Sequence, residues 1–238
     1  ATLRAASGIT TLEYADYPPS DGIYYFGATS VDAAGNESTL SNISAAVSDR
    51  TAPSASVALS SAAPLGAGSY GLTVTVSETL AYAPYLTFTP YGQSPVQVYL
   101  TPDSTLLWRG TLTITADMAS GTGGFSFGGT DLSGNTGGPV TSGQTLALET
   151  DGPTAVLSLA SVKPALKAGT YALNLNLNKP AREAPALSYT IQSGSTETVS
   201  LSSSTNAAAW TGVINIDTTT GESPHNFSYW AYDRLGNK

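Results

Sequence analysis

The sequence contains no cysteine and only one histidine, His225. The absence of cysteine excludes disulfide bonds, thiolate nucleophiles and cysteine-ligated zinc. A lone histidine argues against a histidine-based catalytic triad and against a histidine-rich metal site. Most acidic residues lie in predicted turns and linkers, and the same acids recur along the chain, which indicates a structural role. We therefore expect no enzymatic activity.

Charge is scarce as well. Charged residues make up 11% of the chain, well below the roughly one quarter that is usual in globular domains. The formal net charge is -8, and the 9 Lys and Arg residues are scattered, which argues against binding to nucleic-acid phosphates. No apolar run reaches the ~20 residues of a membrane-spanning helix. We expect neither a nucleic-acid partner nor a direct membrane span.

What the sequence does contain is a repeated turn with the spacing Asp-x-x-Gly-Asn. Each copy follows an apolar, aromatic-bearing run and ends in residues that tolerate positive φ, as is typical of a β-hairpin turn. Three copies about 100 residues apart indicate a tandem array of small β domains. The copies comprise Asp32, Gly35 and Asn36, then Asp131, Gly134 and Asn135, and finally Asp233, Gly236 and Asn237.

Two longer stretches of the chain align with each other between these turns. Leu72, Val74 and Val76 alternate with polar residues, and the matching residues 173–177 show the same alternation. Strict alternation indicates a strand with one face in a core and one in water. No stretch combines a helical period with a helix cap. The prediction is an all-β fold of tandem antiparallel β-sandwich modules.

Two proline-containing linkers, residues 49–53 and 150–153, set the predicted module boundaries, because proline ends strand pairing. We predict a partial module at residues 1–50, a full sandwich at 51–150 and a third module at 151–238 that lacks its last strand. That strand would either follow in the same protein or come from another chain by strand addition.

These motifs carry a resemblance to known families. The stretch 20–38, with its aromatic strand and Asp32 turn, resembles the C-terminal half of a bacterial fibronectin type III domain. Residues 51–150 and 151–238 resemble bacterial immunoglobulin-like domains, which carry an Asp-x-x-Gly-Asn turn near their end and a Thr-Ala-Pro-type linker. The resemblance implies a stalk of a bacterial surface adhesin or accessory domains of a large secreted protein.

One further family element is present only once. Ser77-Glu78-Thr79-Leu80 resembles a common element after the early strand, but the third module has Asn178-Lys179-Pro180 at that place. Because the two modules differ there, we infer no role for Glu78.

The turn aspartates admit two interpretations. Calcium prefers clustered carboxylate and carbonyl oxygens, but one carboxylate per turn is too few, and the spacing differs from an EF-hand loop. The alternative is structural: the Asp accepts hydrogen bonds from backbone N–H groups while Gly and Asn take the positive φ values. We favour the structural role.

The linker aspartates Asp49 and Asp151 are better candidates for metal ligands. They lie at module junctions, where a turn of the neighbouring module could add oxygens. Some bacterial immunoglobulin-like stalks resemble this arrangement and use calcium to stiffen junctions. We therefore expect either no cofactor at all or calcium held at Asp49 and Asp151.

The sequence contains three tryptophans, a residue type that can serve in ligand binding. Trp108 and Trp210 occupy equivalent repeat positions and are expected to pack in or beside a core. Trp230 is expected to point to the opposite face of its strand from Phe227 and Tyr229. Trp230 and Tyr232 could therefore form an exposed aromatic patch that marks a contact surface.

We expect a non-catalytic spacer in a secreted or cell-surface bacterial protein, with other modules of the same or a neighbouring surface protein as partners. The alternatives are an adhesion module that binds a glycan or a protein, and accessory domains of a larger secreted enzyme. Because one sandwich fold hosts many roles, the fold does not choose among them.

Overall fold

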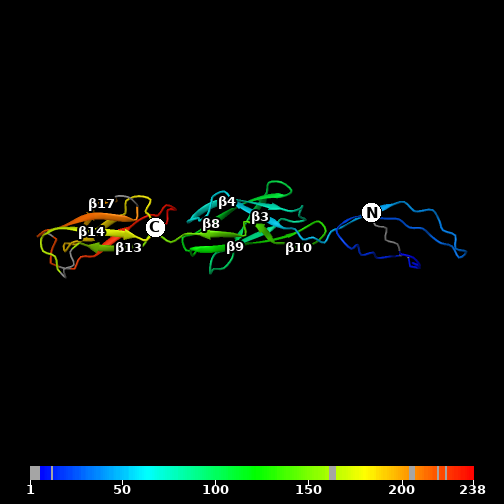
Figure 1. Cartoon of the computed structure of the whole chain (residues 1–238), viewed down its shortest axis with the longest axis horizontal. Coiled ribbons are helices and arrows are strands. Elements are labelled where there is room, and N and C mark those ends of the chain that lie inside the picture. The colour runs from blue at the N-terminus through cyan, green and yellow to red at the C-terminus, as the bar shows by residue number, and fades with distance from the viewer. Residues whose placement is uncertain (1–5, 12, 161–164, 204–206, 219, 223) are drawn as a thin grey trace.

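The computed structural model describes residues 6–11, 13–160, 165–203, 207–218, 220–222 and 224–238, and every regular element in them is a β-strand. The strands form three bodies that lie in a row along the long axis of the molecule (Figure 1). We call them the N-terminal segment (1–50), the second module (51–150) and the third module (151–238). No helix long and apolar enough to cross a membrane occurs in the described residues.

The second module consists of two packed sheets. The first sheet has the order β11-β3-β4-β8-β7, and the second has the order β10-β9-β5-β6, with β12 also paired to β9. The strands are β3 (Ala55–Leu59), β4 (Gly68–Val76), β5 (Tyr85–Thr89), β6 (Val96–Val98), β7 (Leu100–Pro102), β8 (Leu107–Ile114), β9 (Gly121–Thr130), β10 (Thr136–Gly137), β11 (Val140–Ser142) and β12 (Thr145–Leu148).

The predicted alternation explains how these sheets pack. In β4, Leu72, Val74 and Val76 are buried, whereas the threonines between them are not. Phe88 on β5 points from the other sheet into the same core, where it contacts Phe125 with ring centroids 4.9 Å apart. Burial of the apolar face of each sheet is the main stabilising contribution to such a sandwich.

The third module repeats this plan with fewer strands. One sheet has the order β13-β14-β18-β17 and the other the order β16-β15-β19. Val74↔Trp108 in the second module and Leu175↔Trp210 in the third are equivalent pairs, so the registers match. The strands are β13 (Ala155–Leu159), β14 (Gly169–Leu177), β15 (Ala186–Thr190), β16 (Thr196–Val199), β17 (Leu201–Ser202), β18 (Ala209–Ile216) and β19 (Phe227–Trp230).

The N-terminal segment contains only one strand pair among its described residues. β1 (Gly22–Phe26) pairs antiparallel with β2 (Ser44–Ser48). Its apolar side chains are exposed, for example Ile23 at 63% and Val47 at 73%. A two-stranded ribbon cannot enclose a core of its own, so this segment contrasts with the two sandwiches.

The predicted all-β fold is confirmed, with two exceptions to its antiparallel pairing in the described residues. β11 pairs with β3 in parallel, and an isolated parallel bridge joins Leu65 to Leu148. β12 pairs with β9 in the other sheet, whereas β11 lies at the sheet edge beside β3, the first strand of the module. Such a pairing joins the two ends of the module and cannot be deduced from alternation within either strand.

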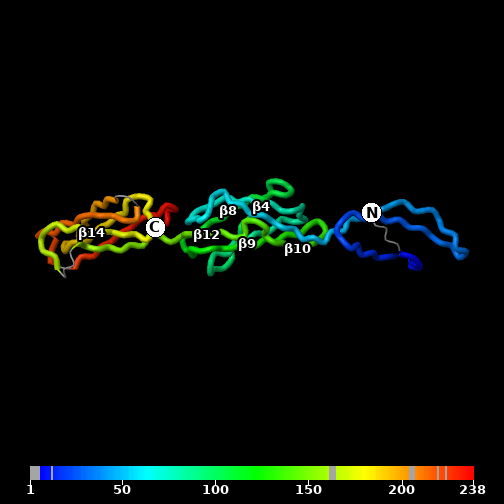
Figure 2. Tube along the Cα trace, viewed as in Figure 1, coloured from blue at the N-terminus to red at the C-terminus, as the bar shows by residue number. Residues whose placement is uncertain are grey.

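The connections between the bodies are short. β2 ends at Ser48 and β3 begins at Ala55, while β12 ends at Leu148 and β13 begins at Ala155. Figure 2 shows the trace passing from one body to the next without folding back. The C-terminus lies on the side of the third module that faces the second (Figure 1), and Lys238 packs against Gly152 of the linker.

Candidate functional site

The three Asp-x-x-Gly-Asn turns share one hydrogen-bond pattern. Asp131 Oδ1 accepts bonds from the backbone N–H groups of Ser133 and Asn135, each at 2.8 Å, and Asp131 Oδ2 accepts a bond from Asn135 Nδ2 at 2.7 Å. Asp32 and Asp233 make the same three bonds within their own turns. The carboxylate thus organises the turn, as its structural interpretation requires.

The prediction that Asn shares the positive φ values is wrong. Gly35, Gly134 and Gly236 have φ of 88°, 90° and 88°, whereas no described residue other than glycine has positive φ. Only the glycine needs the left-handed conformation that side chains disfavour. The Asn instead contributes its side-chain amide, which explains why this position requires a polar donor.

These hydrogen bonds favour the charged form of the turn aspartates. Burial of Asp233 raises the pKa of its carboxyl group, but bonds from Asn237, Lys179 and Leu235 outweigh it and leave the pKa below its ordinary value. The same balance lowers the pKa of Asp131. A carboxylate that accepts several N–H bonds is stabilised in its ionised state.

The turn also reaches beyond its own module. Asn135 Nδ2 donates to the backbone oxygen of Asp49 at 3.1 Å, and Ser133 Oγ donates to Asp49 Oδ2 at 3.2 Å. At the next boundary, Asn237 Nδ2 donates to the backbone oxygen of Glu149 at 2.6 Å. The turns of the second and third modules therefore each bind the chain that enters the module, and we call these contacts the first and second junction.

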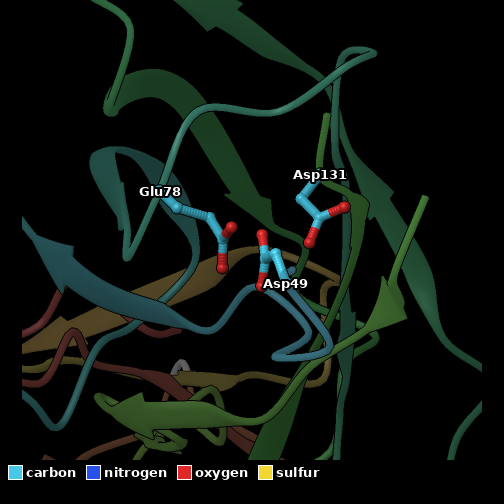
Figure 3. Close-up of side chains that lie close together, drawn as sticks. All are labelled: Asp49, Glu78 and Asp131. Atoms are coloured by element: carbon cyan, nitrogen blue, oxygen red, sulfur yellow. The ribbon is translucent and has the colours of Figure 1, made fainter. Parts of the chain in front are cut away.

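The first junction brings three carboxylates together. One oxygen each from Asp49, Glu78 and Asp131 lies within 4.8 Å of the others, and the side chains point toward one another (Figure 3). Asp49 comes from the linker, Glu78 from the segment after β4, and Asp131 from the turn. Asp131 is buried and the other two are partly buried.

The donor set suits a hard divalent cation, which takes carboxylate oxygens as ligands. Within the part of the chain that the structure describes, no Lys or Arg forms an ion pair with Asp49, Glu78 or Asp131. Burial and the neighbouring carboxylates of Asp49 and Asp131 raise the pKa of Glu78. The cluster thus concentrates negative charge that a cation would relieve.

The second junction has a different composition. Lys179 occupies the place of Glu78, and its ammonium donates to Glu149 Oε1 at 2.7 Å and to the backbone oxygen of Asp151 at 2.6 Å. A third contact reaches Asp233 Oδ2 at 3.4 Å. Burial acts to lower the pKa of Lys179, but the bonds to Glu149 and Asp233 raise it overall.

The predicted metal ligands thus lie in unlike surroundings. Asp49 belongs to the carboxylate cluster, whereas Asp151 offers its backbone oxygen to Lys179 and joins no cluster of three potential ligands in the described residues. The equivalent of Asp49 is Glu149, because Asn135 and Asn237 bind their backbone oxygens. Binding of calcium at Asp49 and Asp151 stays a prediction.

Sequence reasoning missed Glu78 and Lys179. The two residues occupy matching positions, two before the bridges Leu80↔Asp131 and Ala181↔Asp233. Their opposite charges led to the conclusion that the position has no role. The sequence alignment showed the reversal of charge, but only the bridges place both residues beside the turn.

The tryptophans differ in burial, and Tyr232, the predicted partner of Trp230 in a contact surface, is only partly exposed. Trp210 is buried and donates its indole N–H to the Ala207 oxygen at 3.0 Å, and Trp108 packs against the core of the second module. Trp230 is 46% exposed and contacts Tyr232 edge-on, with ring centroids 5.6 Å apart. Lys238 Nζ lies 5.5 Å from the Trp230 ring.

No protein-family model and no curated protein matches the sequence. Among solved structures, a tetra-tandem repeat from the extending region of a large adhesion protein is similar over 91% of this chain, with 17% sequence identity and a TM-score of 0.34. The match covers 54% of that structure, so the chain spans about half of its length.

Proposed function

We propose that the chain is a non-catalytic spacer of a secreted or cell-surface bacterial protein, which holds other parts of that protein at a distance. The observation that carries the proposal is the end-to-end order of the modules, with the Asp-x-x-Gly-Asn turns of the second and third modules hydrogen-bonded to the incoming linkers. A turn that fixes its own module and also holds the linker restricts the angle between neighbours. Rigid modules joined by restricted linkers extend in one direction.

The first linker is also held from its other side. Arg50 donates its backbone N–H to Asp21 Oδ1 at 3.0 Å, and Thr51 Oγ1 donates to Asp21 Oδ2. Asp49 belongs to the same linker and faces Glu78 and Asp131. We propose that calcium binds these three carboxylates and stiffens the first junction, because a cation would join the linker to two elements of the second module.

Small-angle X-ray scattering on the whole chain tests the proposal, with millimolar calcium and with EDTA. We expect an elongated particle in both conditions and a longer maximum dimension with calcium. The matched control is Glu78→Gln, which should respond less to calcium. A compact particle would contradict the spacer function. Identical scattering profiles with and without calcium would contradict the proposal that calcium stiffens the first junction.

A second candidate is recognition of a glycan or a protein through Trp230 and Tyr232. The observation in its favour is the exposed Trp230 ring, since an exposed aromatic face can stack on a sugar or enter an interface. Trp230 fluorescence during a ligand titration separates the two functions. A response that Trp230→Phe abolishes would support binding.

A further inference from the structure

The second junction has a positively charged side chain where the first has a carboxylate. Lys179 follows β14, its side chain is 18% exposed, and its ammonium faces oxygens from both sides of the junction. Glu149 and Asp151 lie in the connection between β12 and β13, whereas Asp233 belongs to the turn of the third module. A lysine ammonium has three N–H donors, so these three oxygens match its full donor capacity.

The two junctions correspond position by position. Asp49 and Glu149 both offer their backbone oxygens to the turn asparagine. Asp131 and Asp233 each organise the turn of their own module. Each also forms a β-bridge to the segment that follows β4 or β14. Glu78 and Lys179 therefore occupy one site in the repeat. With Glu at this position the junction holds three carboxylates. With Lys it holds two carboxylates and one ammonium group.

We propose that Lys179 is the resident cation of the second junction and holds the second and third modules in a fixed relation without a dissolved metal ion. Its bonds to Glu149 and Asp233 are charge-assisted, and such bonds are stronger than those between neutral groups. The small exposure of the side chain limits screening by solvent and salt. One chain thus contains junctions of two kinds, and the second is insensitive to calcium.

This inference goes beyond the proposed function and rests on it only where the two junctions are compared. Removing Lys179 would leave Glu149 and Asp233 facing each other without a cation between them. Their repulsion, together with the lost bond to the Asp151 oxygen, would release the linker from the turn. Loss of fixed geometry, rather than loss of the fold, is the expected consequence, because Lys179 lies outside both core clusters of the third module.

Spin-label distance measurements on the full chain test the proposal. Since the sequence has no cysteine, a label pair at Thr111→Cys and Val213→Cys, on the matching strands β8 and β18, reports on the second junction alone. We expect a narrow distance distribution that is unchanged between calcium chloride and EDTA. In Lys179→Met the distribution should be about twofold broader in both conditions, since free relative motion is usual for unconstrained modules.

Two further variants make the test specific. Lys179→Arg keeps the charge and should keep the distribution narrow, whereas Lys179→Glu reproduces the first junction and should be broad in EDTA and narrower with calcium. If Lys179→Met fails to fold by circular dichroism, Glu149→Gln, which alters only the linker partner, should broaden the distribution instead. A distribution as narrow as wild type in folded Lys179→Met or in Glu149→Gln would overturn the proposal.

A second label pair separates this proposal from the calcium-binding function. Labels at Tyr25→Cys and Thr111→Cys span the first junction. If calcium leaves their distance distribution unchanged while Lys179→Met broadens the second junction, the calcium function fails and the role of Lys179 stands. A wild-type second junction that narrows with calcium would contradict the role of Lys179, whatever the first junction does.

Discussion

At the scale of single residues, Gly123 on β9 shows how tightly the second module is packed. A methyl group at Gly123 would lie 2.4 Å from Phe88 Cζ and 2.7 Å from the Thr89 backbone oxygen. The Phe88 ring is fully buried, so it cannot move into solvent. We expect Gly123→Ala to lower the free energy of unfolding of this module by about 2 kcal/mol, as overpacking commonly does. Urea denaturation measures the change.

The neighbouring glycine provides the matched control. A methyl group at Gly124, in the same strand, would meet nothing closer than the Gln144 oxygen at 3.9 Å. Gly124→Ala should change the free energy of unfolding by less than about 0.5 kcal/mol, as is usual where no contact is disturbed. Equal losses in the two variants would show that flexibility, not space, determines the need for glycine in β9.

Glu78 makes stability depend on pH in a definite direction. Its pKa in the folded chain is raised above the ordinary 4.5 by burial and by the carboxylates of Asp49 and Asp131. A raised pKa means that its contribution to stability is present below the unfolded value and is lost as the pH rises through the folded value. At neutral pH without a cation, ionised Glu78 therefore destabilises the second module.

Glu78→Gln should consequently raise the free energy of unfolding at neutral pH in EDTA, by at most about 1 kcal/mol because the site is partly solvated. The gain should disappear in acid, where Glu78 in the wild type is protonated. Urea denaturation across the pH range measures both effects, with the exposed Glu197→Gln as control. A loss of stability at neutral pH would show that Glu78 makes favourable bonds in place of repulsion.

At the scale of elements, the turn after β9 serves both its own module and the preceding linker. The Asn135 amide donates to Asp131 and to the Asp49 backbone oxygen. We expect Asn135→Ala to broaden the distance distribution across the first junction and to lower the free energy of unfolding by about 1 kcal/mol, the usual net value of a hydrogen bond. Spin labels on β1 and β8 measure the broadening, and urea denaturation measures the stability.

Asn36 supplies the control for that prediction. It occupies the same place in the turn of the N-terminal segment and donates its amide to Asp32, which belongs to the same turn. Asn36→Ala should leave the distance distribution of the first junction unchanged. If both variants broaden it equally, the bond to the linker is not what restrains the junction.

At the scale of the whole molecule, the two sandwiches have separate cores. The cluster around Phe88 contains only residues of the second module, and the clusters around Leu173 and Leu175 contain only residues of the third. A defect such as Gly123→Ala should therefore stay within its own module. The relative orientation of neighbouring modules is therefore set at the junction, by a few polar contacts.

Several of the few charged side chains lie at the two junctions. Of the scattered acids, Asp49, Glu78 and Asp131 gather at the first junction, and Glu149 and Asp233 gather with Lys179 at the second. Each junction thus holds a group of three charged side chains, although other charged residues lie elsewhere on the chain. The stiffness of the first junction is therefore expected to depend on dissolved calcium, and that of the second on the Lys179 ammonium.

The amino-acid pattern alone was enough to predict the main strands and the turns. The alternation of Leu72, Val74 and Val76 places those side chains on one face of a strand, because successive side chains of a strand point to opposite faces. The turn of Asp131, Gly134 and Asn135 depends on contacts over at most four residues. Both signals are local, so they could be predicted without knowledge of the fold.

The composition of the junctions, in contrast, depends on how the chain folds in three dimensions. Asp49, Glu78 and Asp131 are distant in sequence, and they meet because the linker, the segment after β4 and the turn after β9 end at the same edge of the sandwich. The match between Glu78 and Lys179 became meaningful only once the partners of each were known. Electrostatic interaction depends on distance in space, and strand pairing rather than sequence order sets that distance here.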